Sequence, residues 1–101
     1  MSAGTNPLPL GIVPLVNLLF FSSAFCDPCI QTRAVLKSVG AVVPAAKIAE
    51  LDVAKDSVEA ERAGIRSTPT IVIVNDAGDE VFRAEGVPTI NQVLVALAKA
   101  V

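Results

Sequence analysis

Histidine, tryptophan and tyrosine are all absent from this chain of 101 residues. The lack of histidine removes the commonest general base and the commonest metal ligand. The only aromatic side chains are four phenylalanines, which argues against a base-stacking surface for single-stranded nucleic acid. Charged residues make up only 18% of the chain and the net charge is −2, so an electrostatic nucleic-acid binder is excluded as well.

Long hydrophobic runs are also scarce. The most apolar stretch, residues 8–21, is too short to span a bilayer, and two prolines and a glycine in its first seven residues would break a helix there. No basic segment precedes it, so we expect neither a secretory signal nor membrane contact. We predict an irregular leader at 1–14, one domain at 15–101 and a cytoplasmic location. The alternative is a soluble domain trimmed from a longer, membrane-anchored chain.

Hydrophobic residues nevertheless make up 52% of the chain, which is enough for a folded core. Apolar and β-branched runs predict strands at 15–21, 48–53, 70–74 and 80–84, with a hairpin turn at 75–78. Periodic apolar positions predict helices at 28–40, 56–64 and 90–101. In this order the first two strands are parallel and the last two antiparallel. We therefore predict an α/β fold, a mixed four-stranded sheet with helices on both faces.

The ends of the predicted helices carry local signals. Asp27 is the predicted N-cap of the first helix, Pro28 its first residue and Gly40 its end. The later helices begin with two predicted capping boxes, Asp56 with Glu59 and Thr89 with Gln92.

The only two cysteines, Cys26 and Cys29, have C-x-x-C spacing at the junction between the first strand and the first helix. A disulfide across so short a loop would remove little entropy from the unfolded chain, so it would be a poor structural reinforcement. Zinc takes three or four protein ligands, so a metal site would need carboxylates such as Asp27. The spacing therefore favours thiol–disulfide exchange, with a metal or cluster carrier formed across a dimer as an alternative.

Four local motifs occur in an order that matches a known family. Phe25-Cys26-Asp27-Pro28-Cys29 is an aromatic-C-x-P-C sequence that follows a predicted strand. The residues 63–66 precede Thr68-Pro69-Thr70, and two later glycines, Gly78 and Gly86, occupy the hairpin turn and the loop before the last helix. In these motifs, at this spacing, the chain resembles the thioredoxin family from about residue 15 to its C-terminus.

The resemblance implies a thioredoxin-like fold and a thiol–disulfide oxidoreductase that reduces disulfides in partner proteins. Cys26 would be the attacking thiolate, because the partial positive charge and unpaired N–H groups of the helix N-terminus stabilise it. Cys29, one turn inside the helix, would be more buried and would resolve the mixed disulfide. No cofactor is implied, since the dithiol carries the electrons. The implied partners are disulfide-containing proteins and a regenerating reductase, and we expect a monomer.

Five residues would form the substrate-binding surface: Phe25, Asp27, Pro28, Thr68 and Pro69. We expect Pro69 to be cis, as in the family, and to leave backbone groups free to pair with an extended substrate. Pro28 would stiffen the turn that holds the two sulfurs within bonding distance. Asp27 places an acid beside Cys26, which should oppose the effect of the helix N-terminus and favour a reducing protein.

The chain departs from the family pattern at several positions. Phe25 replaces the usual tryptophan, Phe20 replaces the buried acid beneath the active site, and Glu50 replaces its lysine partner. The family's first strand and helix also have no clear counterpart. We hypothesise that Glu50 is a substitute catalytic base, made more basic by partial burial, against the plainer reading of a solvated strand charge. The departures also support a rival function, a non-catalytic binding module that docks a partner at the Cys26/Pro69 groove.

Overall fold

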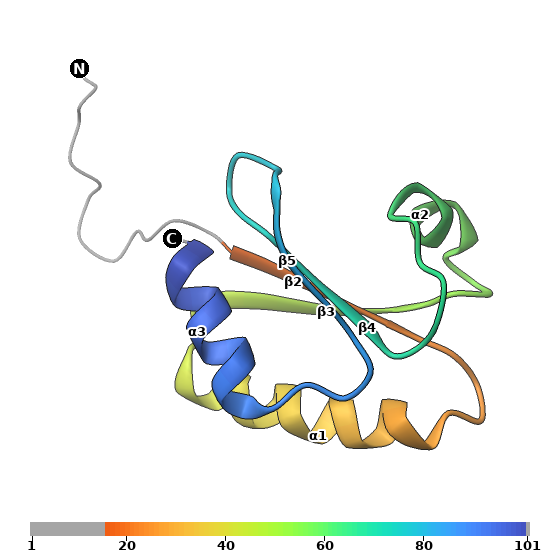
Figure 1. Ribbon diagram of the computed structural model, residues 1–101, viewed down its shortest axis with the longest axis horizontal. Coiled ribbons are helices and arrows are strands. Elements are labelled where there is room, and N and C mark those ends of the chain that lie inside the picture. The colour runs from red at the N-terminus through yellow and green to blue at the C-terminus, as the bar shows by residue number, and fades with distance from the viewer. Residues whose placement is uncertain (1–15, 101) are drawn as a thin grey trace.

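The computed structural model describes residues 16–100 (Figure 1). The predicted leader at 1–14 lies outside the described residues. The described elements run in the order β2 (Val16–Ser22), α1 (Asp27–Val42), β3 (Ala46–Asp52), α2 (Ser57–Arg62), β4 (Thr70–Val74), β5 (Glu80–Glu85) and α3 (Ile90–Ala100). The order of strands and helices predicted from the sequence is confirmed. No helix within these residues is long and apolar enough to cross a membrane.

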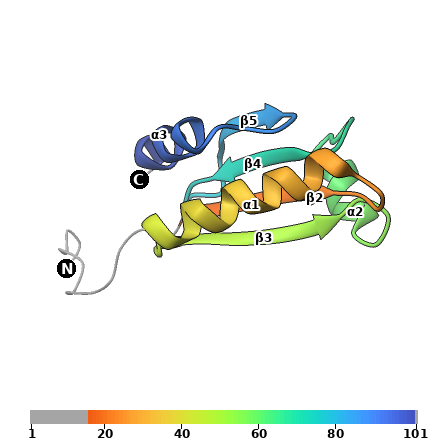
Figure 2. The ribbon, with the colours of Figure 1, turned by 90° about the horizontal axis from the view of Figure 1, so that it is seen from below.

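The described strands form one mixed sheet in the order β3-β2-β4-β5 (Figure 2). β2 pairs with β3 in parallel, whereas β4 pairs antiparallel with both β2 and β5. The parallel pair aligns Phe20 with Glu50 and Ser22 with Asp52, which fixes the positions of these side chains at the end of the sheet where α1 begins. The predicted four-stranded mixed sheet is confirmed.

Helices cover both faces of the sheet, as predicted, with α1 and α3 on one face and α2 on the other (Figure 1). The larger core lies under α1 and α3, and the smaller one lies under α2. Because β2 and β4 are central, their successive side chains enter opposite cores: Leu18 and Phe20 pack in the larger core, and Phe21 packs in the smaller. This explains why the first strand reads as a continuous apolar run.

The first helix continues past its predicted end. Gly40 was expected to terminate it, but α1 extends to Val42, and Val43 is the C-cap. Val43 precedes Pro44, and a residue before proline disfavours the helical conformation, which accounts for the end of the helix. Gly40 instead lies inside α1 opposite Ile48, whose Cδ1 atom would be 3.5 Å from a Cβ atom at that position.

The two predicted capping boxes have different outcomes. Thr89 and Gln92 form theirs: the Gln92 N–H donates to the Thr89 hydroxyl at 3.1 Å, and the Thr89 N–H donates to the Gln92 side chain at 2.9 Å. The box predicted at Asp56 is wrong, because the Asp56 side chain makes no hydrogen bond to the helix. Its carboxylate accepts the Asp52 N–H at 2.9 Å instead, which ties the loop back to the end of β3.

The hairpin between β4 and β5 forms where Asn75 and Gly78 predicted it. The Asn75 side-chain oxygen accepts the N–H groups of Ala77 and Asp79 at 3.1 Å and 2.9 Å. Gly78 has a φ of 90°, a conformation that side chains with a Cβ rarely adopt. The turn therefore holds β5 in register against β4.

We predict that Leu18→Ala lowers the free energy of unfolding by about 2–5 kcal/mol, because Leu18 is 0% exposed in the central strand and its loss leaves a cavity. Val58→Ala, on the exposed surface of α2, is the matched control and should change it by about 0.5 kcal/mol or less. Urea unfolding followed by circular dichroism measures both variants. Equal effects of the two substitutions would contradict this description of the core.

Candidate active site

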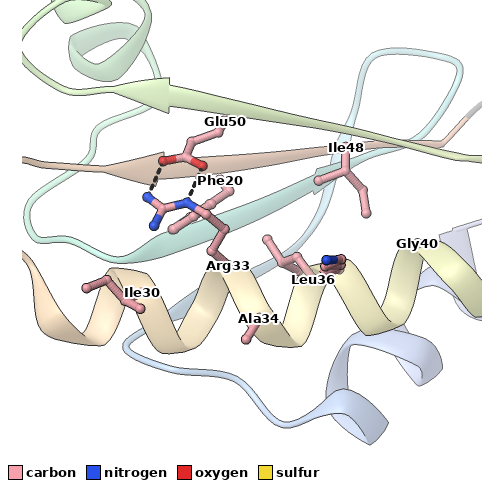
Figure 3. Close-up of a pocket in the computed structure, with 9 residues that line it drawn as sticks. Phe20, Ile30, Arg33, Ala34, Leu36, Gly40, Ile48 and Glu50 are labelled. Atoms are coloured by element: carbon pink, nitrogen blue, oxygen red, sulfur yellow. Dashed lines mark hydrogen bonds and ion pairs between the residues drawn. The ribbon is translucent and has the colours of Figure 1, made fainter.

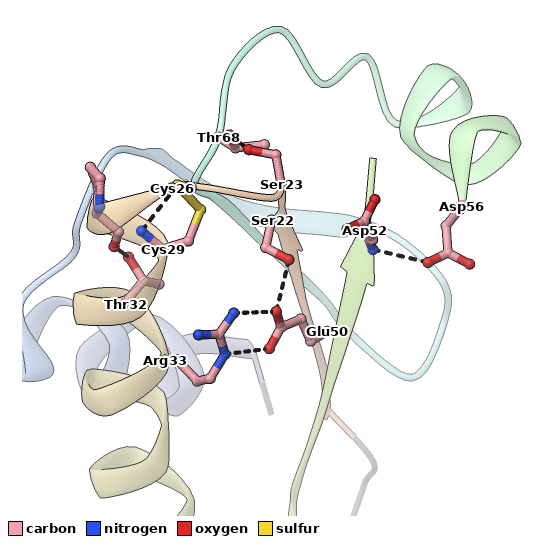
Figure 4. Close-up of polar contacts among 11 residues, drawn as sticks. Ser22, Ser23, Cys26, Cys29, Thr32, Arg33, Glu50, Asp52, Asp56 and Thr68 are labelled. Atoms are coloured by element: carbon pink, nitrogen blue, oxygen red, sulfur yellow. Dashed lines mark hydrogen bonds and ion pairs between the residues drawn. A yellow bond between two sulfur atoms is a disulfide. The ribbon is translucent and has the colours of Figure 1, made fainter. Parts of the chain in front are cut away.

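The cysteine pair lies at the junction between β2 and α1 (Figure 4). Cys26 is the N-cap, with extended backbone at φ −116° and ψ 97°. Its Sγ accepts the Cys29 N–H at 3.1 Å, and its carbonyl accepts the Ile30 N–H at 3.3 Å. The prediction that Asp27 caps the helix is therefore wrong: Asp27 is the first helical residue, and a sulfur takes the place of the capping oxygen.

The two cysteines are joined in a disulfide with their Cα atoms 5.2 Å apart. Cys29 is 1% exposed and packs in the larger core, whereas Cys26 is partly exposed at the tip of the helix. A partner can therefore reach Cys26 but not Cys29. Within residues 16–100 there is no group of three or more His, Cys, Asp or Glu side chains that could hold a metal ion.

Phe25 presents its ring to solvent immediately before the cysteines. It is fully exposed and has a φ of 55°, in the left-handed region that few residues other than glycine adopt. Backbone strain of this kind is found most often at functional sites. Asp27 and Pro28 are also exposed, so the three predicted contact residues around Cys26 form one accessible surface.

The second predicted part of the site, the loop at Thr68 and Pro69, is connected to the first. The peptide bond between these residues is cis, as predicted. The Thr68 hydroxyl lies 2.7 Å from the hydroxyl of Ser23, in the loop before Cys26, so a hydrogen bond joins the two loops. Pro69 is buried and its carbonyl accepts the Gly86 N–H at 2.9 Å, so that group is not open to a substrate. The sequence analysis did not single out Ser23.

Glu50 is engaged on both carboxylate oxygens (Figure 4). Arg33 donates to it through Nε at 2.9 Å and Nη2 at 2.6 Å, and the buried Ser22 hydroxyl donates at 2.7 Å. The hydrogen bonds from Arg33 hold the pKa of Glu50 below its usual value, against a smaller opposing effect of burial. Glu50 is therefore less basic than an ordinary glutamate, and the expectation that it is more basic is wrong. Its role as a proton acceptor stays a prediction.

Arg33 is the residue that the sequence analysis missed. It lies on α1 one turn after Cys29, and its guanidinium carbon is 5.8 Å from the centre of the Phe20 ring. The salt bridge to Glu50 raises the pKa of Arg33. Arg33 and Glu50 line one part of a groove of about 590 Å³ between α1 and β3, where Ile48 and Leu36 contribute apolar walls (Figure 3). Only the packing of α1 on the sheet brings the two charges together.

The chain is similar to thioredoxins in both sequence and fold. The sequence model of the Thioredoxin family matches residues 15–99. The thioredoxin of Chlamydia muridarum is 30% identical over 82 residues, which cover 81% of this chain and 79% of that protein. The thioredoxin of Chlamydia caviae is 33% identical over 69 residues, covering 68% and 67%. The fold is also similar to that of Fasciola hepatica thioredoxin, with a TM-score of 0.77, 21% identity and coverage of 86% and 82%.

We predict that Glu50→Gln lowers the free energy of unfolding by about 1 kcal/mol or less at pH 7, since both partners are partly exposed and solvent screens the salt bridge. Because the pKa of Glu50 is lower when folded, its contribution is complete above the ordinary glutamate pKa of about 4.3 and is lost as the pH falls through the folded value. Urea unfolding from pH 7 to pH 3 measures this. A difference that stays constant down to pH 3 would contradict the assignment.

Proposed function

This chain belongs to the thioredoxin family of thiol–disulfide oxidoreductases, and we propose that it reduces disulfides in partner proteins through the Cys26/Cys29 dithiol. The observation that carries the proposal is the asymmetry of the pair: Cys26 is partly exposed at the N-terminus of α1 and is bonded to Cys29, which is 1% exposed. This asymmetry supports attack by Cys26 and resolution by Cys29.

The proposed reaction has two exchange steps. The Cys26 thiolate attacks one sulfur of a substrate disulfide, and the other substrate sulfur leaves as a thiolate. Cys29 then loses its proton and attacks Cys26 Sγ, so that the Cys26–Cys29 bond forms, the mixed disulfide breaks and the second substrate sulfur leaves. Two electrons pass from the dithiol to the substrate. A regenerating reductase, the usual partner of this family, would return two electrons and two protons.

The docking surface in this proposal consists of the exposed side chains around Cys26 and the loop that faces them. Phe25 offers an apolar ring, and Asp27 and Pro28 flank the sulfur. Thr68 is partly exposed, while Pro69 is buried and would act through the shape of its loop. The hydrogen bond between Ser23 and Thr68 supports the two loops acting as a single surface.

We assign Glu50 to the site as an ionised carboxylate, because a glutamate is charged at neutral pH and the hydrogen bonds from Arg33 lower its pKa further. We also propose that the protein acts as a monomer in a reducing compartment such as the cytoplasm, where thiols stay reduced. A reducing environment keeps the dithiol available for attack, which suits a reductase rather than an oxidase.

The rival proposal is a binding module that docks partners at the groove between Cys26 and Pro69 without turnover. The observation that favours it is Phe20, which is 1% exposed and fills the position of the family's buried acid with a side chain that cannot accept a proton. A module of this kind would bind a partner equally well with both cysteines replaced by serine.

Replacing each cysteine separately tests the proposed reaction. Cys29→Ser should capture substrates as a stable mixed disulfide on Cys26, because the resolving sulfur is gone. Cys26→Ser should capture none, because Cys29 is buried. Mass spectrometry of the reduced variants after exposure to a disulfide-containing peptide measures capture. Faster alkylation of Cys29 than of Cys26 in the reduced wild-type protein would reverse the assignment.

The charge of Asp27 provides a second test. Its carboxylate is exposed in the first turn of α1, so it should destabilise the Cys26 thiolate and favour the disulfide, which makes the dithiol a better reductant. Asp27→His should shift the equilibrium with glutathione toward the oxidising side by about tenfold, or about 30 mV. Asp76→His, an exposed change in the distant hairpin, is the control. A wild-type potential in the oxidising range, or a shift in the opposite direction, would disprove the argument.

A further inference from the structure

The resolving cysteine has to ionise in apolar surroundings. Cys29 is 1% exposed and belongs to the same core as Phe20 of β2, Ile71 of β4 and Val93 of α3. None of the buried side chains in this core carries a charge. A thiolate in such an environment loses its hydration, so burial disfavours the charged form of a thiol.

Few charged side chains lie on the parts of α1 and β3 near this region. On α1 they are Asp27 in the first turn, Arg33, and Lys37, which lines the same groove as Arg33 one turn further on. On β3 they are Glu50 and, at the end of the strand, Asp52, whose carboxylate is turned to the N–H groups of residues 54 and 55. The core residues contributed by β2, β4 and α3 are uncharged. Of these groups, Arg33 lies on the same helix as Cys29, four residues later, so the two positions are neighbours on the helix surface.

Of the positively charged side chains named above, Arg33 is the one whose position is held by hydrogen bonds. Two hydrogen bonds to Glu50, at 2.6 Å and 2.9 Å, hold its guanidinium, and its carbon lies 5.8 Å from the centre of the Phe20 ring. Figure 4 shows the guanidinium between α1 and Glu50, one turn after Cys29 on the same helix. The positive end of the ion pair therefore belongs to the helix of the resolving thiol, and the negative end belongs to β3.

We propose that Arg33 is a positioning residue for the resolving step: its charge promotes ionisation of the Cys29 thiol, and Glu50 sets the strength of this effect as the counter-charge. The proposal rests on the function proposed above. In this role Glu50 opposes ionisation of Cys29, whereas a base would promote it. If Glu50 were a base, Glu50→Gln would slow substrate release. If Glu50 is the counter-charge, Glu50→Gln leaves the charge of Arg33 unbalanced and favours the Cys29 thiolate.

The first measurement is the pKa of Cys29 in the background Cys26→Ser, where it is the only thiol. Thiolate absorbance at 240 nm is well suited because the chain has no tyrosine or tryptophan. Glu50→Gln should lower this pKa and Arg33→Gln should raise it, each on the order of half a unit, because a screened charge acts more weakly than one in contact. The double variant Arg33→Gln/Glu50→Gln should return close to the Cys26→Ser value.

The second measurement is the rate at which a mixed disulfide on Cys26 is resolved at pH 7 with both cysteines present. A shift of half a pKa unit corresponds to about a twofold change in rate, since part of the gain in thiolate is offset by lower nucleophilicity. Glu50→Gln should be about twofold faster and Arg33→Gln about twofold slower. Arg33→Lys, which keeps the charge, should restore most of the wild-type rate.

Glu80→Gln is the matched control. Glu80 makes the same two-bond salt bridge with Arg83, at 2.8 Å and 2.9 Å, but pairs with Val74 at the far end of β4. Glu80→Gln should change neither the Cys29 pKa nor the resolution rate, and thermal unfolding checks that every variant is folded.

If the salt bridge had a purely structural role, Glu50→Gln and Arg33→Gln would change the Cys29 pKa and the resolution rate in the same direction. The double variant would then not return to the starting values. That result, or slower release in Glu50→Gln, overturns the proposal. Failure of the wild-type protein to reduce any disulfide would instead refute the proposed function and leave the pKa measurement valid.

Discussion

The start of α1 is the constraint on which the rest of the site depends. The Cys29 N–H donates to Cys26 Sγ at 3.1 Å, so the helix begins at the sulfur itself. This single contact places Cys26 at the positive end of the helix, where a thiolate is stabilised, and places Cys29 one turn deeper in the core. The order of attack and resolution proposed here follows from where the helix begins.

The charges beneath this junction are arranged differently from the family pattern. An acid is absent at Phe20, which fills the core with an apolar ring, and an acid is present on the neighbouring strand at Glu50. Arg33 neutralises Glu50 from the helix side, and Ser22 binds it from the end of β2. The outcome is an ion pair at the edge of the core in place of a single buried carboxyl. It can influence ionisation of Cys29 by its field, without taking up the proton.

The sequence predicted the elements well, because apolar periodicity and the C-x-x-C and T-P-T motifs are local signals. The hairpin at Asn75 came from such a local signal, whereas the cis bond before Pro69 was implied by the resemblance to the thioredoxin family; both are confirmed. The prediction of Asp27 as the N-cap was wrong. Whether Cys26 or Asp27 caps the helix depends on the backbone conformation of the loop between β2 and α1, which local sequence does not determine. The pairing of Arg33 with Glu50 could not be predicted, since 17 residues separate them and only the packing of α1 on β3 brings them together.

We propose that the Cys26/Cys29 dithiol transfers electrons to disulfides in other proteins. Reduction of insulin by the wild-type protein in the presence of dithiothreitol, followed as the turbidity of the released chains, tests it most directly. Precipitation should start earlier and proceed faster as the concentration of the protein increases. A turbidity curve that does not differ from that of dithiothreitol alone, at any concentration of a folded protein, would contradict it.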